Sequence, residues 1–379
     1  MSRLKYGIDL GTTNSALTRI IKGESEIVKN SLQQDTTPSC VGFTRNGGVQ
    51  IGTKAFNQLK SDKLRALKSG KAFASNIFLE FKRTMGTDQK YHSDNMNVDF
   101  SSQQLSSEVL KSLKSLVDDN FKSVVITTPA MFNDNQKSAT IEAANLSGFD
   151  QVELLAEPIA AATAFGVDEQ AKDGNILVFD FGGGTFDVCF ISIEEGIMQV
   201  KDTGGDNWLG GKNLDEAIVD KIILPYLKEN YKIDSFLKDD TKKGQLNSVL
   251  NLYAEELKVS MSFSDEGEIV SMLGDLPDDD DGKEIELDIL VNAEDMNDVL
   301  APIFQIAIDH TLELLKRNKL KGSDLYSLLL VGGPTFSPIL RKMVSDQICK
   351  PNTNVDPMTV VARGAAIYAT KFDVDEVIK

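Results

Sequence analysis

The sequence predicts an α/β protein made of two similar halves, because one polar pattern occurs twice. Residues 176–191 read ILVFDFGGGTFDVCFI: an apolar strand pattern stops at Asp180, crosses three glycines and a threonine, and then resumes. Residues 6–17, YGIDLGTTNSAL, repeat that order around Asp9. Both turns lead from strand to strand, whereas P-loops and dinucleotide-binding fingerprints lead from a strand into a helix. Exposed backbone N–H groups in such turns are suited to holding an anion.

A second pair of segments supports the duplication. Residues 123–133 (SVVITTPAMFN) and 327–337 (SLLLVGGPTFS) each combine a buried-type strand, a turn of small residues with a proline, and a helical pattern. Two hairpins and two strand–turn–helix units in the same order indicate an internal duplication. A chain of 379 residues also suits two lobes better than a single core. We therefore expect a ligand between the lobes, held by both hairpins.

The other elements follow from hydrophobic periodicity. Alternating apolar residues predict strands, and apolar spacings of three and four predict helices, most clearly in LSSEVLKSLKSLVDDN. The expected strands are 4–10, 14–21, 25–29, 123–128, 152–155 and 326–331, with a central hairpin region at 175–202 and a β-rich acidic excursion at 266–291. The expected helices are 53–60, 105–120, 134–148, 156–166, 213–231, 243–263, 294–317, 337–349 and 359–370.

Charge and hydropathy exclude several classes of partner. The formal net charge is −17, from 40 basic and 57 acidic residues, which disfavours nucleic acid and anionic membranes as partners. No apolar run approaches the ~18 residues of a membrane span. The N-terminus runs into the first strand without a signal-peptide core. The acidic run 278–281 lacks the alternating oxygen spacing of a calcium loop, so we expect a solvated hairpin tip there.

Cysteine and histidine are scarce. Cys40, Cys189 and Cys349 are odd in number and widely separated, so neither a disulfide framework nor a zinc site is expected, and a cytoplasmic location is the default. His92 and His310 are the only histidines. Serine–histidine triads and histidine-rich metal sites are therefore poor candidates.

Nine segments, taken in order, resemble those of a known family, the DnaK-like ATPase domain of the 70-kilodalton heat-shock chaperones. The resemblance covers nearly the whole chain. The segments are GIDLGTTNS, TTPS, EFKRTMG, TTPAMFNDNQKSAT, LLAEPIAAATAFG, VFDFGGGTFDV, GDNWLGG, LLLVGGPTFSP and VDPMTVVARGAA.

The resemblance implies the actin-like ATPase fold, in which two duplicated lobes, each with a large and a small subdomain, close over a nucleotide. The first lobe is expected over residues 1–169, with its small subdomain at about 39–98. The second lobe is expected over 170–358, with its small subdomain at about 210–291. A C-terminal helix within 359–379 is expected to return to the first lobe.

The function implied is that of an ATP-binding, Mg²⁺-dependent ATP hydrolase module of a heat-shock-type chaperone with slow turnover. ATP or ADP and Mg²⁺ are the expected cofactors, with K⁺ as a second candidate ion. Two alternatives share the fold: a sugar- or acetate-type small-molecule kinase and an actin-like filament protein. The segments EFKRTMG and GDNWLGG and the acidic excursion at 266–291 favour the chaperone.

Roles carried over from the family fall on matching residues. Phosphoryl transfer to water needs charge neutralisation, a held metal and a positioned water. The implied metal ligands are Asp9, Asp180 and Asp187, and the catalytic residues are Lys82, Glu157, Thr185 and Asp180. The implied phosphate contacts are Gly11, Thr12, Thr13, Asn14, Gly182, Gly183, Gly184 and Thr185.

Without the resemblance, the sequence supports some of these roles more strongly than others. Two aspartates that end buried-type strands, Asp9 and Asp180, need an electrostatic reason. By itself, the pair Lys82-Arg83 would be interpreted as a solvated face. Glu157, before a proline, would be interpreted as a favourable first-turn charge.

The adenosine end departs from the family pattern. Val259 stands where animal members of the family carry an arginine and the bacterial form carries an aliphatic residue, and Phe336 replaces an arginine that stacks on the base. We therefore expect the base to lie between an aliphatic and an aromatic side chain. Pro334 replaces a serine there. The implied nucleoside contacts are Glu255, Lys258, Ser262, Gly332, Gly333, Phe336 and Asp356.

The family also implies protein partners, namely a nucleotide-exchange factor and a J-domain co-chaperone. Glu153 stands where the family carries its J-domain-docking arginine, and Ala156 and Ile159 replace neighbouring polar residues. The chain ends at KFDVDEVIK, with no apolar linker and no peptide-binding β-sandwich. We therefore expect either an excised ATPase domain or a stand-alone relative, with the excised domain favoured.

Overall fold

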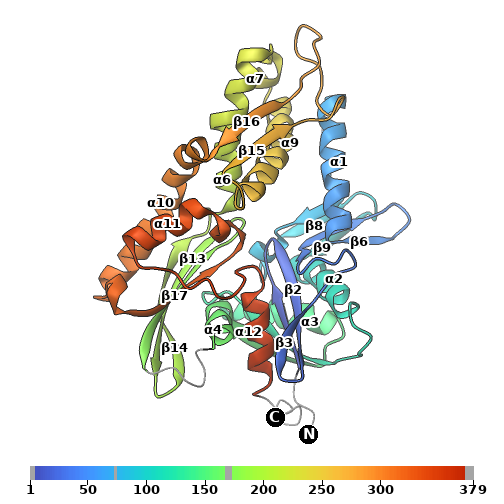
Figure 1. Cartoon of the computed structure of the whole chain (residues 1–379). Helices are drawn as coiled ribbons and strands as arrows, with labels where there is room; N and C mark the ends of the chain where they lie inside the picture. The colour runs from blue at the N-terminus through green and yellow to red at the C-terminus, as the bar shows by residue number, and fades with distance from the viewer. Residues whose placement is uncertain (1–4, 72–74, 167–172, 372–379) are drawn as a thin grey trace.

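The computed structural model describes residues 5–71, 75–166 and 173–371. These residues form two α/β lobes with helices around several separate sheets (Figure 1). The predicted fold class, an actin-like α/β fold with duplicated lobes, is confirmed. The predicted boundary between the lobes, at residues 169 and 170, lies outside the described residues, as do residues 1–4 and 372–379.

The first lobe is built on one sheet, formed by β1 (Tyr6–Leu10), β2 (Asn14–Ile21), β3 (Glu24–Val28), β4 (Thr37–Pro38), β10 (Ser123–Thr128) and β11 (Gln151–Ala156). The strand order is β11–β10–β1–β2–β3, with β4 beside β2. β1 pairs antiparallel with β2 and parallel with β10. The polar turn around Gly11 is therefore the tip of the β1–β2 hairpin.

The second lobe repeats this arrangement with β12 (Gly174–Phe181), β13 (Phe186–Glu194), β14 (Ile197–Asp206) and β17 (Leu325–Val331). Their order is β14–β13–β12–β17, with β12 antiparallel to β13 and parallel to β17. In both lobes, a three-stranded meander thus pairs through its first strand with the strand of a strand–turn–helix unit. This shared topology is the duplication that the two hairpin patterns predict.

Two smaller assemblies extend the lobes. In the first lobe they are β5 (Cys40–Phe43), β6 (Val49–Ile51), β7 (Ile77–Leu79), β8 (Lys90–Ser93), β9 (Val98–Ser101), the helix α1 (Thr53–Ser69) and the 3₁₀ turn η1 (Phe81–Thr84). In the second they are α6 (Gly211–Ile218), the π-helical turn η2 (Val219–Ile223), α7 (Leu224–Asn230), α8 (Asp234–Lys238), α9 (Asp240–Ser260), β15 (Glu266–Val270) and β16 (Asp288–Asn292).

The remaining helices pack on the large sheets. They are α2 (Ser102–Lys114), α3 (Asp134–Leu146), α4 (Glu157–Ala164), α10 (Ala293–Arg317), α11 (Pro338–Gln347), α12 (Val360–Ala369) and the short turns η3 (Gly322–Asp324) and η4 (Gly333–Phe336). Local capping explains several starts: Ser101 with Gln104 and Asn133 with Gln136 form reciprocal capping boxes at α2 and α3. Asn292 caps α10 in the same way.

The apolar core contains a section shared by the two lobes. Side chains of α4 and α12 meet side chains of β12 and β13, so apolar residues from both lobes pack in one cluster. Small residues allow the closest approach, because a Cβ on Gly364 of α12 would lie 1.7 Å from the carbonyl oxygen of Ala160 in α4. α12 also contacts β1 and β2, and Figure 1 shows it lying between the two large sheets.

Helix α1 links the smaller assemblies across the lobes. It runs alongside α9 (Figure 1). Leu67 is 3% exposed and belongs to the apolar cluster of the second lobe, with Leu64 packed at its edge. Lys60 forms an ion pair of 2.8 Å with Glu256, and Gln245 donates a hydrogen bond to the carbonyl oxygen of Lys71.

Several predicted bounds are wrong. α1 continues to Ser69 rather than ending at 60, because its second half has the apolar contacts with α9 just described. α2 begins at Ser102, where the capping box places its first turn, and ends at Lys114 rather than 120. The expected helix at 213–231 is interrupted by η2, and most of residues 271–287 in the acidic excursion lie outside strands. The strands β4 to β9 were not predicted.

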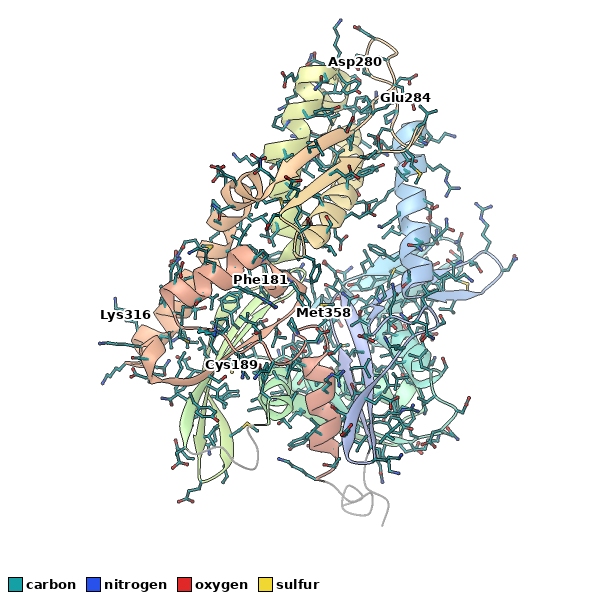
Figure 2. All side chains as sticks on the ribbon, viewed as in Figure 1. Phe181, Cys189, Asp280, Glu284, Lys316 and Met358 are labelled. Atoms are coloured by element: carbon teal, nitrogen blue, oxygen red, sulfur yellow. The ribbon has the colours of Figure 1, made fainter. Side chains whose placement is uncertain are left out.

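The acidic run at 278–281 is at a tip, as expected, but it is not simply solvated. Figure 2 shows Asp280 and Glu284 at the far end of the second lobe. Asp279 is 9% exposed and accepts hydrogen bonds from the backbone N–H groups of Lys232 and Lys283, among others. Asp280 accepts one from the N–H of Ser235. The bonds from Lys232 and Ser235 tie the tip to the segment between α7 and α8 and to α8 itself.

Within the described ranges, no helix combines the length and apolarity that a bilayer crossing requires.

The glycine contact between α4 and α12 can be tested by substitution. Gly364→Val should lower the free energy of unfolding by about 1–3 kcal/mol or more, because the added side chain must push the two helices apart. Gly244→Ala is the matched control, since an added Cβ there meets nothing within 4 Å. It should be neutral or stabilising by up to about 1 kcal/mol, because alanine favours a helix interior. Urea unfolding measures both, and equal stabilities of the two variants would contradict the close packing at Gly364.

Candidate functional site

Four carboxylates gather where the two large sheets face each other; we call Asp9, Glu157, Asp180 and Asp187 the carboxylate cluster. Asp180 and Asp187 are directly opposite each other on β12 and β13. Asp9 is the last residue but one of β1 and accepts a 2.9 Å hydrogen bond from Thr127 Oγ1 on β10. Glu157 begins α4. The duplicated strands therefore deliver acidic side chains from both lobes to one place.

Removal from bulk water raises the pKa of three members of the cluster. The pKa of Asp9 and that of Asp187 each rise to about 6, with Glu157 adding to the rise. The pKa of Asp180 rises well above its ordinary value, again through burial first and then through Glu157, Asp187 and Asp9. Lys82 opposes all three shifts. The cluster holds more negative charge than one lysine can balance, so it favours a further cation.

Lys82 is the cation within the cluster. It lies in η1 and is 5% exposed, and its Nζ is 2.7 Å from Glu157 Oε1. Its Nζ also lies 5.7 Å from the ring centroid of Phe132. Since an unpaired buried charge is costly, the ion pair with Glu157 fixes the position of this lysine.

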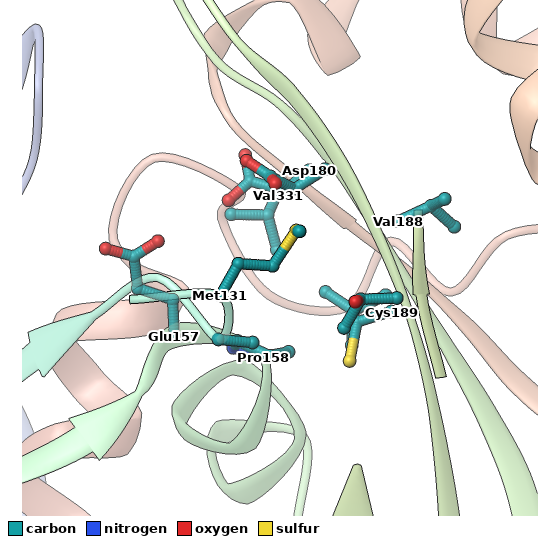
Figure 3. Close-up of a pocket in the computed structure, with 11 residues that line it drawn as sticks. Met131, Glu157, Pro158, Asp180, Val188, Cys189 and Val331 are labelled. Atoms are coloured by element: carbon teal, nitrogen blue, oxygen red, sulfur yellow. The ribbon is translucent and has the colours of Figure 1, made fainter. Parts of the chain in front are cut away.

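A small cavity opens beneath the cluster. Its volume is about 20 Å³, enough for a single water. Asp180, Asp187 and Glu157 contribute carboxylates to its wall, and Met131 and Cys189 contribute apolar surface (Figure 3). Most of the wall is apolar, and the carboxylates supply the polar partners that an ordered water needs.

The first glycine turn, residues 11–14, is braced from within its own lobe. The N–H of Gly11 donates to Ser15 Oγ at 3.2 Å, and Ser39 Oγ donates to the carbonyl oxygen of Gly11 at 2.7 Å. The N–H of Ser39 donates to the carbonyl oxygen of Thr13. A Cβ on Gly11 would lie 2.0 Å from the Asn14 carbonyl oxygen, so the turn needs glycine there.

The second glycine turn, residues 182–185, is braced by the first turn of α6 and by Gly210 just before it. The N–H of Gly211 donates to the carbonyl oxygen of Gly182, and the N–H of Lys212 donates to that of Gly183, both at 2.9 Å. A Cβ on Gly210 would lie 2.5 Å from Gly184 Cα. The backbone at Gly210 packs directly on the backbone at Gly184, which leaves no room for a side chain at position 210.

The two glycine turns also meet each other. A Cβ on Gly183 would lie 2.3 Å from Thr13 Oγ1, so only glycine allows this approach between the lobes. The two turns, in which the N–H groups of Gly11 and Gly182 already have partners, thus face each other above the carboxylate cluster. The arrangement suits a polyanion whose counter-ion is shared with the cluster.

The predicted nucleoside contacts begin along α9, to one side of the turns. Lys258 Nζ pairs with Asp215 at 2.5 Å and donates to the carbonyl oxygen of Gly211 at 3.1 Å. Ser262 Oγ donates to the carbonyl oxygen of Lys258. Glu255 lies close enough to Lys63 of α1 for their charges to interact. Asp215 has a pKa raised to about 6 by burial, against the opposing effect of Lys258.

Phe336 lies at the surface near the end of α9 rather than in the core. It is half-buried, and its ring centroid is 5.4 Å from that of Phe263, which is 72% exposed. Arg341 covers it at 5.5 Å, held by a hydrogen bond from its Nε to the carbonyl oxygen of Thr335. Val259 is 55% exposed. An aromatic surface, backed by a cation, is therefore available to a planar ligand.

The last predicted contacts lie behind Asp180. Gly332 has a φ of 90°, and a Cβ there would lie 2.2 Å from the carbonyl oxygen of Phe181 and 3.2 Å from Asp180 Oδ1. A Cβ on Gly333 would approach Met358 Sδ. Asp356 is exposed and accepts a hydrogen bond from the N–H of Met358, in the turn that leads into α12. Its side chain supports this turn rather than reaching the carboxylate cluster through any bond of its own.

The residues present fit a bound magnesium nucleotide. Within the described part of the chain, no three acidic, histidine or cysteine side chains converge closely enough to ligate an ion directly. Carboxylates around an ion that keeps its waters would be spaced in this way. The excess negative charge, seen in the raised pKa values, supplies the attraction.

Sequence reasoning missed several residues that shape the site. Their side chains brace the turns or the named ligands, and most of their partners are distant in sequence. They are Ser15, Ser39, Glu80, Arg83, Thr127, Trp208, Lys212, Asp215, Phe263 and Arg341. Ser15, Ser39, Glu80, Arg83, Thr127 and Trp208 lie within the segments that resemble the family, but those segments did not indicate these contacts.

Comparison with known proteins agrees with this geometry. The family described as Hsp70 protein matches residues 5–377. The chaperone protein DnaK of Thermosipho melanesiensis is 35% identical over 373 residues, covering 96% of this chain and 58% of that protein. Chaperone protein DnaK of Methanothermobacter thermautotrophicus is 34% identical, covering 95% and 58%, and that of Thermoplasma acidophilum is 36% identical, covering 97% and 58%. The chain thus spans a little over half the length of these relatives. It belongs to the Hsp70 family.

Proposed function

We propose that this chain is an ATP-binding, Mg²⁺-dependent ATP hydrolase module of a heat-shock-type chaperone. The observation that carries the proposal is the pair of glycine turns facing each other above one carboxylate cluster. The turns offer backbone donors to phosphates from both lobes, and the cluster offers negative charge to a cation. Membership of the Hsp70 family supports the same conclusion.

Different residues bind the phosphates and the metal ion in this proposal. The glycine turns at 11–14 and 182–185 bind and orient the phosphates, with the hydroxyls of Thr12, Thr13 and Thr185 as further donors. Mg²⁺ bound beside Asp9, Asp180 and Asp187 would neutralise charge that develops on the phosphates. The carboxylates hold their positions through the strand ends and through the bond from Thr127.

Lys82 and Glu157 are placed to act on the reacting end. The ion pair holds Lys82 directed into the cluster, where its Nζ can hold an attacking water and a terminal phosphate oxygen. The small cavity beside Glu157, Asp180 and Asp187 provides room for one water. Glu157 and Thr185 orient that water in this proposal.

The nucleoside is assigned to the surface along α9. Glu255, Lys258 and Ser262 bind the ribose and base edge, while Val259 and Phe336 flank the base. Gly332 and Gly333 let the chain pass close to the nucleotide, and Asp356 holds the turn beside them. Lys258 is pre-positioned by Asp215.

The chaperone context is part of the proposal. A cytoplasmic location, a nucleotide-exchange factor and a J-domain co-chaperone as partners, and K⁺ as a second ion follow from the family. The lobe boundaries proposed above, 1–169, 170–358 and 359–379, follow from it as well. Calorimetry with ATP, ADP and GTP tests the nucleotide, and phosphate release without an added acceptor separates an ATPase from a kinase. Light scattering with ATP tests for filaments.

Removing one charge from the cluster should affect stability and binding in opposite directions. Burial raises the pKa of Asp180 in the folded chain, so the ionised form of this side chain destabilises the fold. The stability that the protonated form contributes is fully present below the pKa that Asp180 has in the unfolded chain. It is lost as pH rises through the pKa that Asp180 has in the folded chain. Asp180→Asn should therefore raise the melting temperature at pH 7 without nucleotide. It should also abolish most of the stabilisation by Mg·ADP, because a cation loses part of its attraction.

Differential scanning calorimetry with and without Mg·ADP checks both effects. Asp88→Asn, at an exposed position, is the control and should change neither. Full Mg·ADP stabilisation of Asp180→Asn would contradict the assignment of Asp180 to the metal.

Lys82 should matter mainly for turnover. Lys82→Ala should bind ATP within about threefold of wild type but lower kcat by about 100-fold or more, because a donor to the reacting phosphate and water acts chiefly in the transition state. Single-turnover hydrolysis and equilibrium binding separate the two quantities. Parallel losses in both would indicate that Lys82 is structural.

Phe336 should matter mainly for affinity. Its half-buried ring can stack on a base, and base–aromatic stacking is worth about 1–3 kcal/mol, so Phe336→Ala should weaken ATP and ADP binding about ten- to a hundredfold. Hydrolysis of bound ATP should change little, because the base is remote from the γ-phosphate. Leu273→Ala, at a side chain 79% exposed, is the matched control. Lower stability with unchanged ADP affinity would contradict stacking.

A further inference from the structure

Arg83 reaches from the first lobe to the second glycine turn. It follows Lys82 in η1, yet its Nη2 donates to the carbonyl oxygens of Gly184, at 3.1 Å, and of Asn207, at 2.5 Å. The two neighbouring cations of η1 therefore bind different partners. Lys82 enters the carboxylate cluster, and Arg83 binds backbone of the opposite lobe.

The guanidinium has two further contacts, with Trp208 and with Glu80. Its Cζ lies 5.0 Å from the ring centroid of Trp208, and its Nη1 lies 3.3 Å from Glu80 Oε2. Glu80 also pairs with Lys212 of the second lobe at 2.5 Å. Glu80 has a φ of 55°, a left-handed conformation that side chains adopt rarely. A charged residue is thus held in an uncommon backbone geometry where it binds cations from both lobes.

These contacts act on the phosphate-binding backbone itself. Gly184 belongs to the second glycine turn, and a Cβ on it would lie within 3.6 Å of Arg83 Nη1. Because a carbonyl and the following N–H share one peptide plane, fixing the carbonyl of Gly184 fixes the direction of the Thr185 N–H. Separating the lobes must break both carbonyl contacts of Arg83 and the Glu80–Lys212 pair.

We propose that Arg83 is a positioning residue that holds the cleft closed over the phosphates by binding the carbonyls of Gly184 and Asn207 across the lobes. Its contact with Trp208 places that ring as a reporter of closure. The proposal rests on the proposed nucleotide-binding function, because it names the step that Arg83 controls: escape of bound nucleotide.

The test uses the single tryptophan of the chain. Arg83→Ala should increase acrylamide quenching of Trp208 fluorescence only slightly without nucleotide, because the residue is already 78% exposed and loses only the guanidinium 5.0 Å from its ring. It should also speed dissociation of a fluorescent ADP analogue with Mg²⁺ by about tenfold, as expected for losing charged hydrogen bonds at a partly exposed site. Arg83→Lys keeps the charge but loses the fork, so it should speed dissociation about threefold.

Arg65→Ala is the matched control, since Arg65 pairs with Asp62 within α1 and has a side chain 73% exposed. It should leave both quenching and dissociation unchanged. An unchanged rate of ADP-analogue dissociation from Arg83→Ala would overturn the proposal, whatever the quenching shows. If Arg83→Ala does not fold, an unchanged dissociation rate from Arg83→Lys would overturn it. Failure of the wild-type chain to bind Mg·ADP would instead overturn the proposed function, and this inference with it.

Discussion

The rest of the site depends on one electrostatic constraint: four carboxylates from two lobes are held together with a single lysine among them. Like charges in register on neighbouring strands are unfavourable, as Asp180 and Asp187 are on β12 and β13. The strand ends tolerate this arrangement because the sheets behind them are firmly packed. The repulsion among the carboxylates also makes the site favour a cation, since a cation bound between the two lobes relieves the repulsion in both. A ligand that brings such a cation therefore stabilises the closed arrangement as it binds.

Much of this architecture could be predicted because its signals lie in residues that are close together in the sequence. The hairpins around Asp9 and Asp180 have alternating strands on either side of a glycine turn, and both sides of that pattern lie within a few residues. The same holds for α2 and α3, whose capping residues precede their apolar periodicity. Glycine contacts such as Gly183 with Thr13 explain why the pattern tolerates no other residue, although the sequence alone did not reveal the partner.

What could not be predicted depends on residues far apart in the chain. The length of α1 depends on apolar contacts with α9, which no local pattern in residues 61–69 identifies as facing another lobe. Arg83 looked like one half of a solvated basic pair, yet its partners are about a hundred or more positions away, at Gly184 and Asn207. The sequence predicts that Phe336 flanks the base, but it does not identify Phe263 and Arg341 as the neighbours that leave this ring half-buried at the surface.

The packing of α1 sets how often the two lobes can part. Leu67 belongs to the first lobe by sequence but is buried among side chains of the second. Exposing a buried leucine to water costs about 1.5–3 kcal/mol. That one side chain alone would make the open arrangement about ten- to a hundredfold rarer than the closed one. A binding protein that offered its own apolar surface to Leu67 would repay this cost, and would raise the open population without touching the nucleotide at all.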